Sequence, residues 1–189
     1  LMRDIEREDY DKKIRNLGLL SDLVKKTILD ENQIQSISNT FAEAKGSMFL
    51  GRGFSYPIAL EGALKLKELA YIHAEGYPAG EMKHGPLALI EDGMPVVVIA
   101  PKDDYYKKTI SNMQEVIARG AKVLLLTNKD ANQVISENIW QTIKIETTNN
   151  DLYPFLTTIP LQKLAYFTAL KKGYDIDKPR NLAKSVTVE

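Results

Sequence analysis

Short apolar runs alternate with longer segments of helical period, and this alternation restricts the possible folds more than any other feature of the chain. The runs are rich in β-branched residues, and they predict strands at 48–50, 96–99, 123–126 and 143–145. Helical period predicts helices over 57–70, 104–118 and 152–171. Strands that alternate with helices pair in parallel through right-handed crossovers. The pattern therefore predicts a three-layer α/β fold.

The regions outside this alternation have other patterns. Two helices are predicted before the first strand, because apolar residues recur at helical spacing over 14–28 and again over 34–44. The segment 72–77 fits either a fifth strand or a loop. After Gly173, which is a plausible helix stop, no apolar period is sustained. We therefore predict an N-terminal helical segment at 1–46, an α/β domain at 47–174 and an extended tail at 175–189.

Composition excludes several kinds of function. Basic and acidic residues both number 25, so there is no net charge to attract nucleic acid or anionic lipid. The chain has no cysteine, which excludes disulfides, thiolate metal sites and thiol nucleophiles. No apolar run approaches the roughly 20 residues of a membrane-spanning helix, and the charged opening is not a signal peptide. We predict a cytoplasmic domain without nucleic-acid or membrane partners, and its start within a helix-like segment suggests a piece of a longer protein.

The turn that follows the first predicted strand is a candidate anion site. It contains Gly51, Arg52, Gly53 and Ser55, and it leads into a helix with Ser55 as its expected cap and Pro57 in its first turn. Ligands of open α/β sheets bind at the carboxyl ends of strands, where free amides at a helix start attract phosphate. Two glycines are too few for a dinucleotide fingerprint. A phosphate contact and a plain tight turn both remain open.

The helix predicted at 57–70 has two contrasting faces. One face is a stripe of mostly small residues suited to close packing: Ala59, Gly62, Ala63, Leu66 and Ala70. The other face carries Glu61, Lys65 and Glu68, and residues three or four positions apart are neighbours on a helix. From the spacing alone, a solvated ion-pair face is the favoured interpretation.

Two further candidates lie outside regular elements. The connection 73–86 is dense in glycine, proline and acidic residues and holds both histidines, His73 and His84. An imidazole is readily tuned for proton transfer near neutral pH, but a structural hydrogen-bonding role is favoured for both side chains on sequence grounds. Neither histidine has metal-ligand spacing to a partner. Lys184 is, by composition, one of many surface lysines in a tail.

Five blocks of the sequence resemble the second sugar-isomerase (SIS) domain of the glucosamine-6-phosphate synthase family. They are GRG at 51–53, YPIALEGALKLKE at 56–68, YIHAE at 71–75, GEMKHGP at 80–86 and KPRNLAKSVTVE at 178–189. The last block is similar to the string that ends the chains of that family, which makes Glu189 the expected natural C-terminus. The first 45 or so residues resemble the segment that joins the two SIS lobes. The resemblance implies a parallel, flavodoxin-like sheet of about five strands.

The resemblance also implies an activity and assigns roles to residues. The whole enzyme would convert fructose-6-phosphate and glutamine into glucosamine-6-phosphate and glutamate without a cofactor or metal. Lys184 would add to the ketone of the opened sugar, Glu68 would move a proton between carbons 1 and 2, and His84 would assist ring opening. Lys65 would hold substrate or tune charge beside Glu68. Ala183 would contact substrate.

The chain also departs from the pattern of the whole family. It has neither an N-terminal cysteine nucleophile nor the Ser/Thr-rich phosphate loop of the first SIS lobe. The expected partners are therefore that first lobe, a glutaminase domain, and a second copy in a homodimer whose site His84 would reach. Weak or absent turnover is expected of this chain alone. Two alternatives are a stand-alone phosphosugar isomerase and a non-catalytic phosphosugar-binding or dimerisation module.

Overall fold

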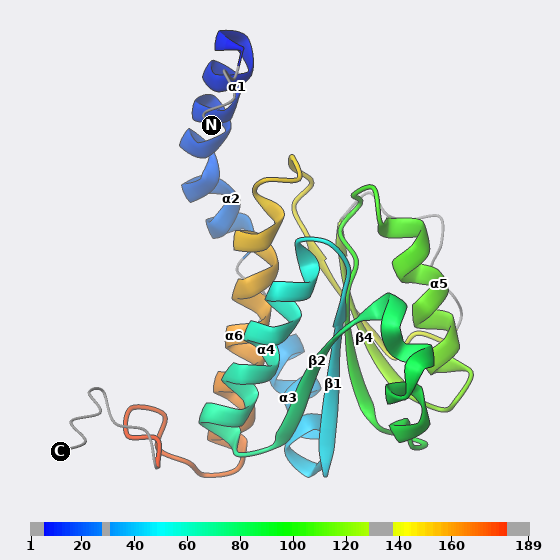
Figure 1. The fold of residues 1–189 in the computed structure, drawn as a ribbon. Helices are drawn as coiled ribbons and strands as arrows, with labels where there is room; N and C mark the ends of the chain where they lie inside the picture. The colour runs from blue at the N-terminus through cyan, green and yellow to red at the C-terminus, as the bar shows by residue number, and fades with distance from the viewer. Residues whose placement is uncertain (1–5, 28–30, 129–137, 181–189) are drawn as a thin grey trace, which may run out of the picture.

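A computed structural model describes residues 6–27, 31–128 and 138–180, and it contains one parallel five-stranded sheet (Figure 1). The strands are β1 (Gly46–Gly51), β2 (His73–Pro78), β3 (Pro95–Ile99), β4 (Lys122–Asn128) and β5 (Gln141–Ile145). Their order is β2-β1-β3-β4-β5, with every neighbouring pair parallel. This is the flavodoxin-like order of doubly wound sheets, so the predicted fold class is confirmed.

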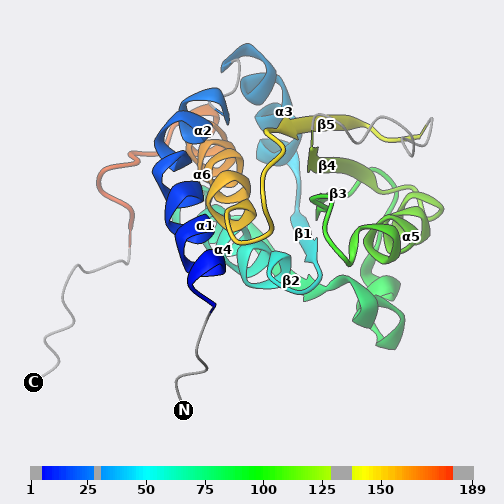
Figure 2. The same cartoon turned by 90° about the horizontal axis from the view of Figure 1, so that it is seen from above.

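Two helical layers cover the sheet (Figures 1 and 2). One layer contains α3 (Glu31–Glu43), α4 (Ser55–Ala70) and α6 (Tyr153–Lys171), and the other contains α5 (Tyr106–Ile117) with the short 3₁₀ helices η1 (Ala79–His84) and η2 (Pro86–Leu89). Successive strand residues point to opposite layers. In β3, for example, Val97 and Ile99 join the α3/α4/α6 core, while Val96 and Val98 join the α5 core.

The small-residue stripe of α4 packs where it was predicted to pack. Ala59, Gly62, Ala63, Leu66 and Ala70 are all buried. A Cβ added at Gly62 would lie 2.7 Å from Leu161 of α6 and 2.9 Å from Phe49 of β1. Close packing of this kind fixes the position of α4 on the sheet, and with it the position of the charged residues on its opposite face.

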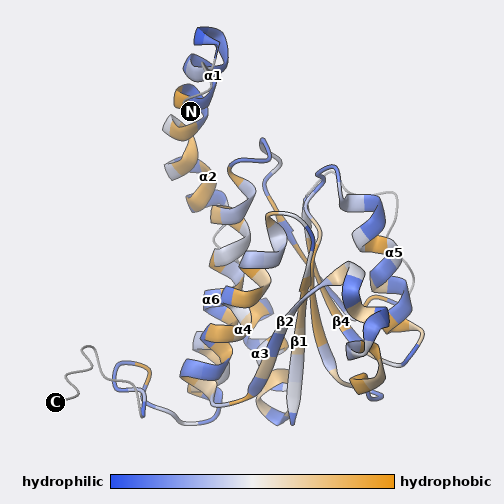
Figure 3. Cartoon of the chain, viewed as in Figure 1, coloured by the Kyte–Doolittle hydropathy of each residue, from blue (hydrophilic) through white to orange (hydrophobic). Residues whose placement is uncertain are grey.

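The first helices differ from the prediction. Residues 14–28 were expected to form one helix, but the structure has α1 (Arg7–Gly18) and α2 (Leu20–Thr27), which meet at Leu19. Glycine is a poor helix former, and α1 ends at Gly18. Three apolar residues of α2 pack against the start of α6. By contrast α1 buries no residue and extends beyond the rest of the fold, with apolar and polar residues mixed on its surface (Figures 1 and 3).

The last described residues of the chain follow α6. Residues 172–180 leave the end of α6 as turns and bends without further helix or strand, and most of the predicted extended tail at 175–189 lies outside the described residues. Within the described residues, no helix is both long and apolar enough to cross a membrane.

Candidate active site

The charged face of α4 forms a compact ion-pair cluster. The Lys65 ammonium lies 2.7 Å from Glu68 Oε2 and 3.6 Å from Glu61 Oε1. The Lys65 and Glu68 side chains are 29% and 27% exposed, so both are half-buried against the helix surface. The hydrogen bond to Glu68 raises the pKa of Lys65, against the opposing effect of burial, and the negative charge of Glu61 adds to the increase.

This cluster has a chemical capacity beyond that of a surface ion pair. Exposed ion pairs contribute at most about 1 kcal/mol to the free energy of unfolding, so the cluster adds little to the stability of the fold. Lys65 Nζ donates a hydrogen bond to Glu68 Oε2 at 2.7 Å, which fixes the orientation of the carboxyl group on α4. An ionised carboxylate on a rigid helix can act as a general base. The predicted proximity of these residues is confirmed, while their catalytic role stays a prediction.

The chain returns to the same end of α4 just before its last residues. Lys184 and Ala183 lie outside the described residues. Arg180 donates its backbone N–H to the Tyr71 hydroxyl at 2.7 Å, and Tyr71 directly follows α4, three residues after Glu68. The described structure therefore brings Arg180 against the residue that follows α4, the helix that carries the Lys65–Glu68 pair.

His84 is not part of this cluster. It ends η1, in the layer on the opposite face of the sheet from α4 (Figures 1 and 2). Its side chain is 73% exposed, and Nδ1 lies 2.8 Å from Glu81 Oε2. His73 lies at the start of β2, also exposed, with Nε2 3.5 Å from Glu75. Convergence of Glu68 and His84 within one copy of the chain is therefore not observed.

The segment 73–86 was predicted as a long connection, and this was wrong. It forms the edge strand β2, which resolves the open question at 72–77, and then η1. In β2 only Ala74 is fully buried, so the strand has no apolar run for sequence reasoning to detect. Gly76 fits under α4, where an added Cβ would lie 2.8 Å from the Leu60 backbone nitrogen.

The turn at 51–55 lies at the carboxyl end of β1, beside the point where the strand order reverses. Gly53 has φ +53°, and the Tyr105 ring lies against it. Arg52 donates from Nη1 to Asn112 Oδ1 at 2.9 Å, and its guanidinium lies against Gly80, where an added Cβ would lie 2.9 Å from Nη1, so it ties the turn to α5 and η1. Ser55 was expected to cap α4, but the cap residue is Phe54, and no side-chain cap bond forms.

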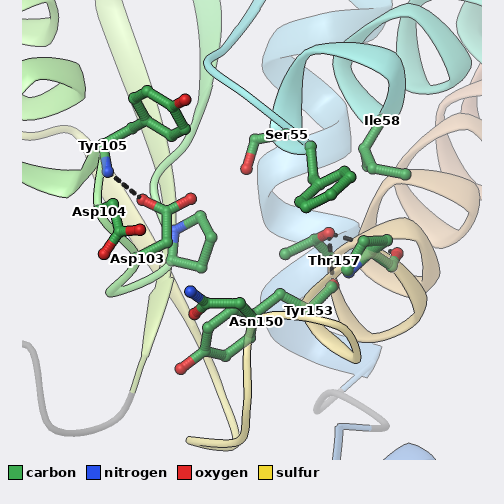
Figure 4. Close-up of a pocket in the computed structure, with 11 residues that line it drawn as sticks. Ser55, Ile58, Asp103, Asp104, Tyr105, Asn150, Tyr153 and Thr157 are labelled. Carbon is green, nitrogen blue, oxygen red and sulfur yellow. Dashed lines mark hydrogen bonds between the residues drawn. The ribbon is translucent and has the colours of Figure 1, made fainter. Parts of the chain in front are cut away.

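A small cavity of about 70 Å³ opens beside this turn (Figure 4). Ser55 lies on one side and Asp103 on the other, with Asp104, Tyr105 and Asn150 around the rim. Two carboxylates repel phosphate, so the cavity does not support an anion site at the turn. The sequence signal that could have shown this was the acidic pair Asp103 and Asp104, which begins four residues after the end of β3, since the carboxyl ends of parallel strands meet at one edge of the sheet.

Replacing Asp103 with Asn should stabilise the fold at neutral pH. Burial raises the pKa of the Asp103 carboxyl, so its ionised form costs stability at pH 7, and this cost disappears as pH falls toward the ordinary value of 3.8. Asparagine keeps the oxygen that accepts the Tyr105 N–H. We expect a higher thermal midpoint for Asp103→Asn at pH 7 and a shrinking difference from the parent toward pH 4. A lower midpoint for this variant at all pH values would contradict the assignment, and Asp104→Asn is the control.

The described residues contain no cluster of three or more His, Cys, Asp or Glu side chains that could hold a metal ion.

The cavity and the ion-pair cluster lie at opposite ends of α4. Ser55 at the cavity and Glu68 in the ion-pair cluster are 13 residues apart, about 20 Å along a helix. The cavity and the cluster are therefore separate features of one helix.

A family model described as "SIS domain" matches residues 40–172. The chain is 50% identical over 184 residues to a glutamine–fructose-6-phosphate aminotransferase [isomerizing] of Aquifex aeolicus, covering 97% of this chain and 31% of that protein. It is also 50% identical over 185 residues to the protein of that name from Bacteroides thetaiotaomicron, covering 98% of this chain and 30% of the relative. The chain thus spans about 30% of the length of these curated relatives.

A solved structure agrees with these matches. It is the C-terminal domain of glucosamine-fructose-6-phosphate aminotransferase from Francisella tularensis, with a TM-score of 0.88 and 42% identity. The superposition covers 92% of this chain and 49% of that one. The same arrangement of sheet and helices is therefore present in that protein, where it makes up about half of the chain.

Proposed function

The chain belongs to the SIS domain family, and on that premise we propose that it is the isomerase lobe of an enzyme that makes glucosamine-6-phosphate from fructose-6-phosphate and glutamine-derived ammonia. The observation that carries the proposal is the fixed Lys65–Glu68 pair at the end of α4 to which the C-terminal segment returns. The roles given below to Glu68, Lys65, Lys184 and His84 are parts of this proposal.

Glu68 is the base that moves a proton between carbons 1 and 2. Conversion of a ketose imine to an aldose amine takes a proton from carbon 1 and returns one to carbon 2 through a planar intermediate. One carboxylate above that plane can perform both transfers. The support is geometric, since α4 is held by its buried small-residue stripe and Lys65 Nζ donates to Glu68 Oε2 at 2.7 Å.

Lys184 is the amine that adds to the ketone of the opened sugar. The neutral amine attacks the carbonyl carbon, and loss of water leaves an imine. Lys65 would help to hold the substrate beside Glu68, because its ammonium lies 2.7 Å from Glu68 Oε2. Ala183 would contact the sugar beside Lys184.

His84 serves the site of a second copy of the chain. Its imidazole is exposed on the layer opposite α4, where it can project toward a neighbouring subunit. There it would donate and accept the protons exchanged during ring opening. The phosphate would be held chiefly by a lobe that this chain does not contain, because the turn at 51–55 is occupied by packing contacts and lies beside two carboxylates. A homodimer follows from this assignment.

Borohydride trapping tests the proposal. Fructose-6-phosphate and borohydride are added to the full-length enzyme that carries this sequence, and the peptide bearing the reduced adduct is identified by mass spectrometry. We expect the adduct on Lys184 and none in Lys184→Arg, since a guanidinium does not form imines under these conditions. The matched control is Lys178→Arg, in which the adduct should remain.

The other outcomes identify the alternatives. An adduct retained in Lys184→Arg would contradict the assigned nucleophile. Conversion of fructose-6-phosphate to glucose-6-phosphate by the 189-residue chain alone would favour a stand-alone phosphosugar isomerase. Full activity in variants of Lys184, Glu68 and His84 would favour a non-catalytic phosphosugar-binding or dimerisation module.

A further inference from the structure

Tyr71 has an unusual backbone conformation. It directly follows α4, and its φ of 54° places it in the left-handed region. It is the only non-glycine residue with positive φ in the part of the chain that the structure describes. Glycine is the usual residue at this position of a helix end, because a side chain is strained there. Strain of this kind persists where surrounding contacts fix the residue.

The contacts that fix Tyr71 come from the C-terminal segment. The Arg180 guanidinium carbon lies 4.1 Å from the centre of the Tyr71 ring, and the Arg180 N–H donates to the Tyr71 hydroxyl at 2.7 Å. The Tyr174 ring lies 4.7 Å away, centre to centre. One side chain next to α4 thus contacts the segment at two points, and the sequence separation between Tyr71 and Arg180 is 109 residues.

The segment between these two points is itself held in place. Tyr174 donates its N–H to Ala169 O, and Lys172 Nζ donates to Ala42 O, in the last turn of α3, at 3.4 Å. Tyr174 and Ile176 pack against the main core. Asp175 Oδ1 accepts the N–H groups of two following residues. The chain is therefore attached to the domain from the end of α6 up to Arg180.

We propose that Tyr71 and Arg180 are positioning residues: together they fix the point at which the C-terminal segment leaves the domain, three residues along the chain from Glu68. This inference rests on the proposed role of Lys184. Arg180 is the last residue that the structure describes, and Lys184 follows it by four positions in the sequence. A short tether raises the local concentration of the amine at Glu68, and a misplacement of about 1 Å can cost about 100-fold in rate.

The chemistry of the contact requires both partners. A planar guanidinium stacks on an aromatic face, which an ammonium does less well, and the hydroxyl adds a bond to the backbone. Arg180 is exposed and makes no contribution to the buried core, so its replacement is not expected to unfold the domain. A structural role alone would predict a loss of stability, whereas a positioning role predicts a loss of turnover at unchanged stability.

The test uses the full-length enzyme with Arg180→Gln, Arg180→Lys, Tyr71→Leu and the Tyr71→Leu/Arg180→Gln double variant. We expect Arg180→Gln and Tyr71→Leu each to lower kcat about tenfold, with KM for fructose-6-phosphate within about twofold. Arg180→Lys should recover part of the loss. The double variant should be no worse than the poorer single variant, because both changes break one contact. Tyr166→Leu, a half-exposed tyrosine of α6 that pairs with Phe167, is the control and should leave kcat unchanged.

Hydrogen exchange of the peptide covering 172–180 supplies a readout that does not depend on catalysis. Exchange should be faster by about fivefold or more in Tyr71→Leu and Arg180→Gln, and unchanged in Tyr166→Leu. Unchanged exchange, a kcat within twofold of the parent in Arg180→Gln, or additive losses in the double variant would overturn the inference. If the parent forms no adduct at Lys184, the proposed function fails, and the exchange result still decides whether the anchor exists.

Discussion

Replacement of Glu68 by Gln should lower kcat for glucosamine-6-phosphate formation on the order of 10³-fold in the full-length enzyme. General base catalysis by a positioned carboxylate contributes about 10²- to 10⁴-fold, and the amide is isosteric but cannot accept the proton. Glutamine also retains an oxygen that can accept from Lys65, which lies 2.7 Å from Glu68 Oε2 in the present structure. The change therefore removes the base with little change of shape.

Two measurements separate this role from others. Trapping with borohydride should still label Lys184 in Glu68→Gln, because imine formation precedes the carbon-to-carbon proton transfer, and exchange of deuterium from solvent into carbon 1 should be lost. Glu61→Gln is the matched control, since Glu61 also contacts Lys65 but at 3.6 Å, and its kcat should stay within about threefold of the parent. Equal losses in the two variants would show that only the charge of the cluster matters.

Replacement of Gly51 by Ala should cost about 3 kcal/mol or more of the free energy of unfolding. The added Cβ would lie 2.2 Å from the Ser55 carbonyl oxygen and 2.8 Å from the Tyr56 nitrogen. Both atoms belong to the backbone at the start of α4, so no side chain can rotate away. Overpacking of this kind costs about 1–3 kcal/mol where neighbours adjust, and more where they are fixed.

Chemical denaturation of the 189-residue chain tests this expectation. The control is Gly18→Ala, where an added Cβ meets nothing within 4 Å and where alanine is the better helix former, so stability should stay equal or rise by up to about 1 kcal/mol. An unfolding free energy for Gly51→Ala within 0.5 kcal/mol of the parent would show that the turn relaxes easily. The turn would then not be a rigid link between β1 and α4.

The sheet could be predicted from sequence because its central strands are continuous apolar runs. Residues of β3 and β4 are buried on both faces, so their side chains are apolar at almost every position. The edge strand β2 could not be assigned, since only one of its six residues is fully buried. A run of apolar residues marks a strand only where the strand is buried, and a strand at the edge of a sheet is buried less than a central one.

The ion-pair cluster was also predictable, because residues three and four positions apart on a helix are neighbours whatever the rest of the chain does. The location of His84 was not. Whether η1 lies on the α4 side or the α5 side of the sheet depends on how the chain crosses from β2, and the spacing of residues gives no information on that crossing.

Sequence by itself thus determined the parallel α/β class, the family and the charged face of α4, all of which depend on local periodicity or on matching blocks. Only the tertiary structure decided that Tyr71 and Arg180 meet and that Glu68 and His84 lie in different layers. The physical reason is that contacts between distant residues depend on the packing of whole elements. Side-chain periodicity fixes which face of each element is buried and leaves open which elements that face will contact.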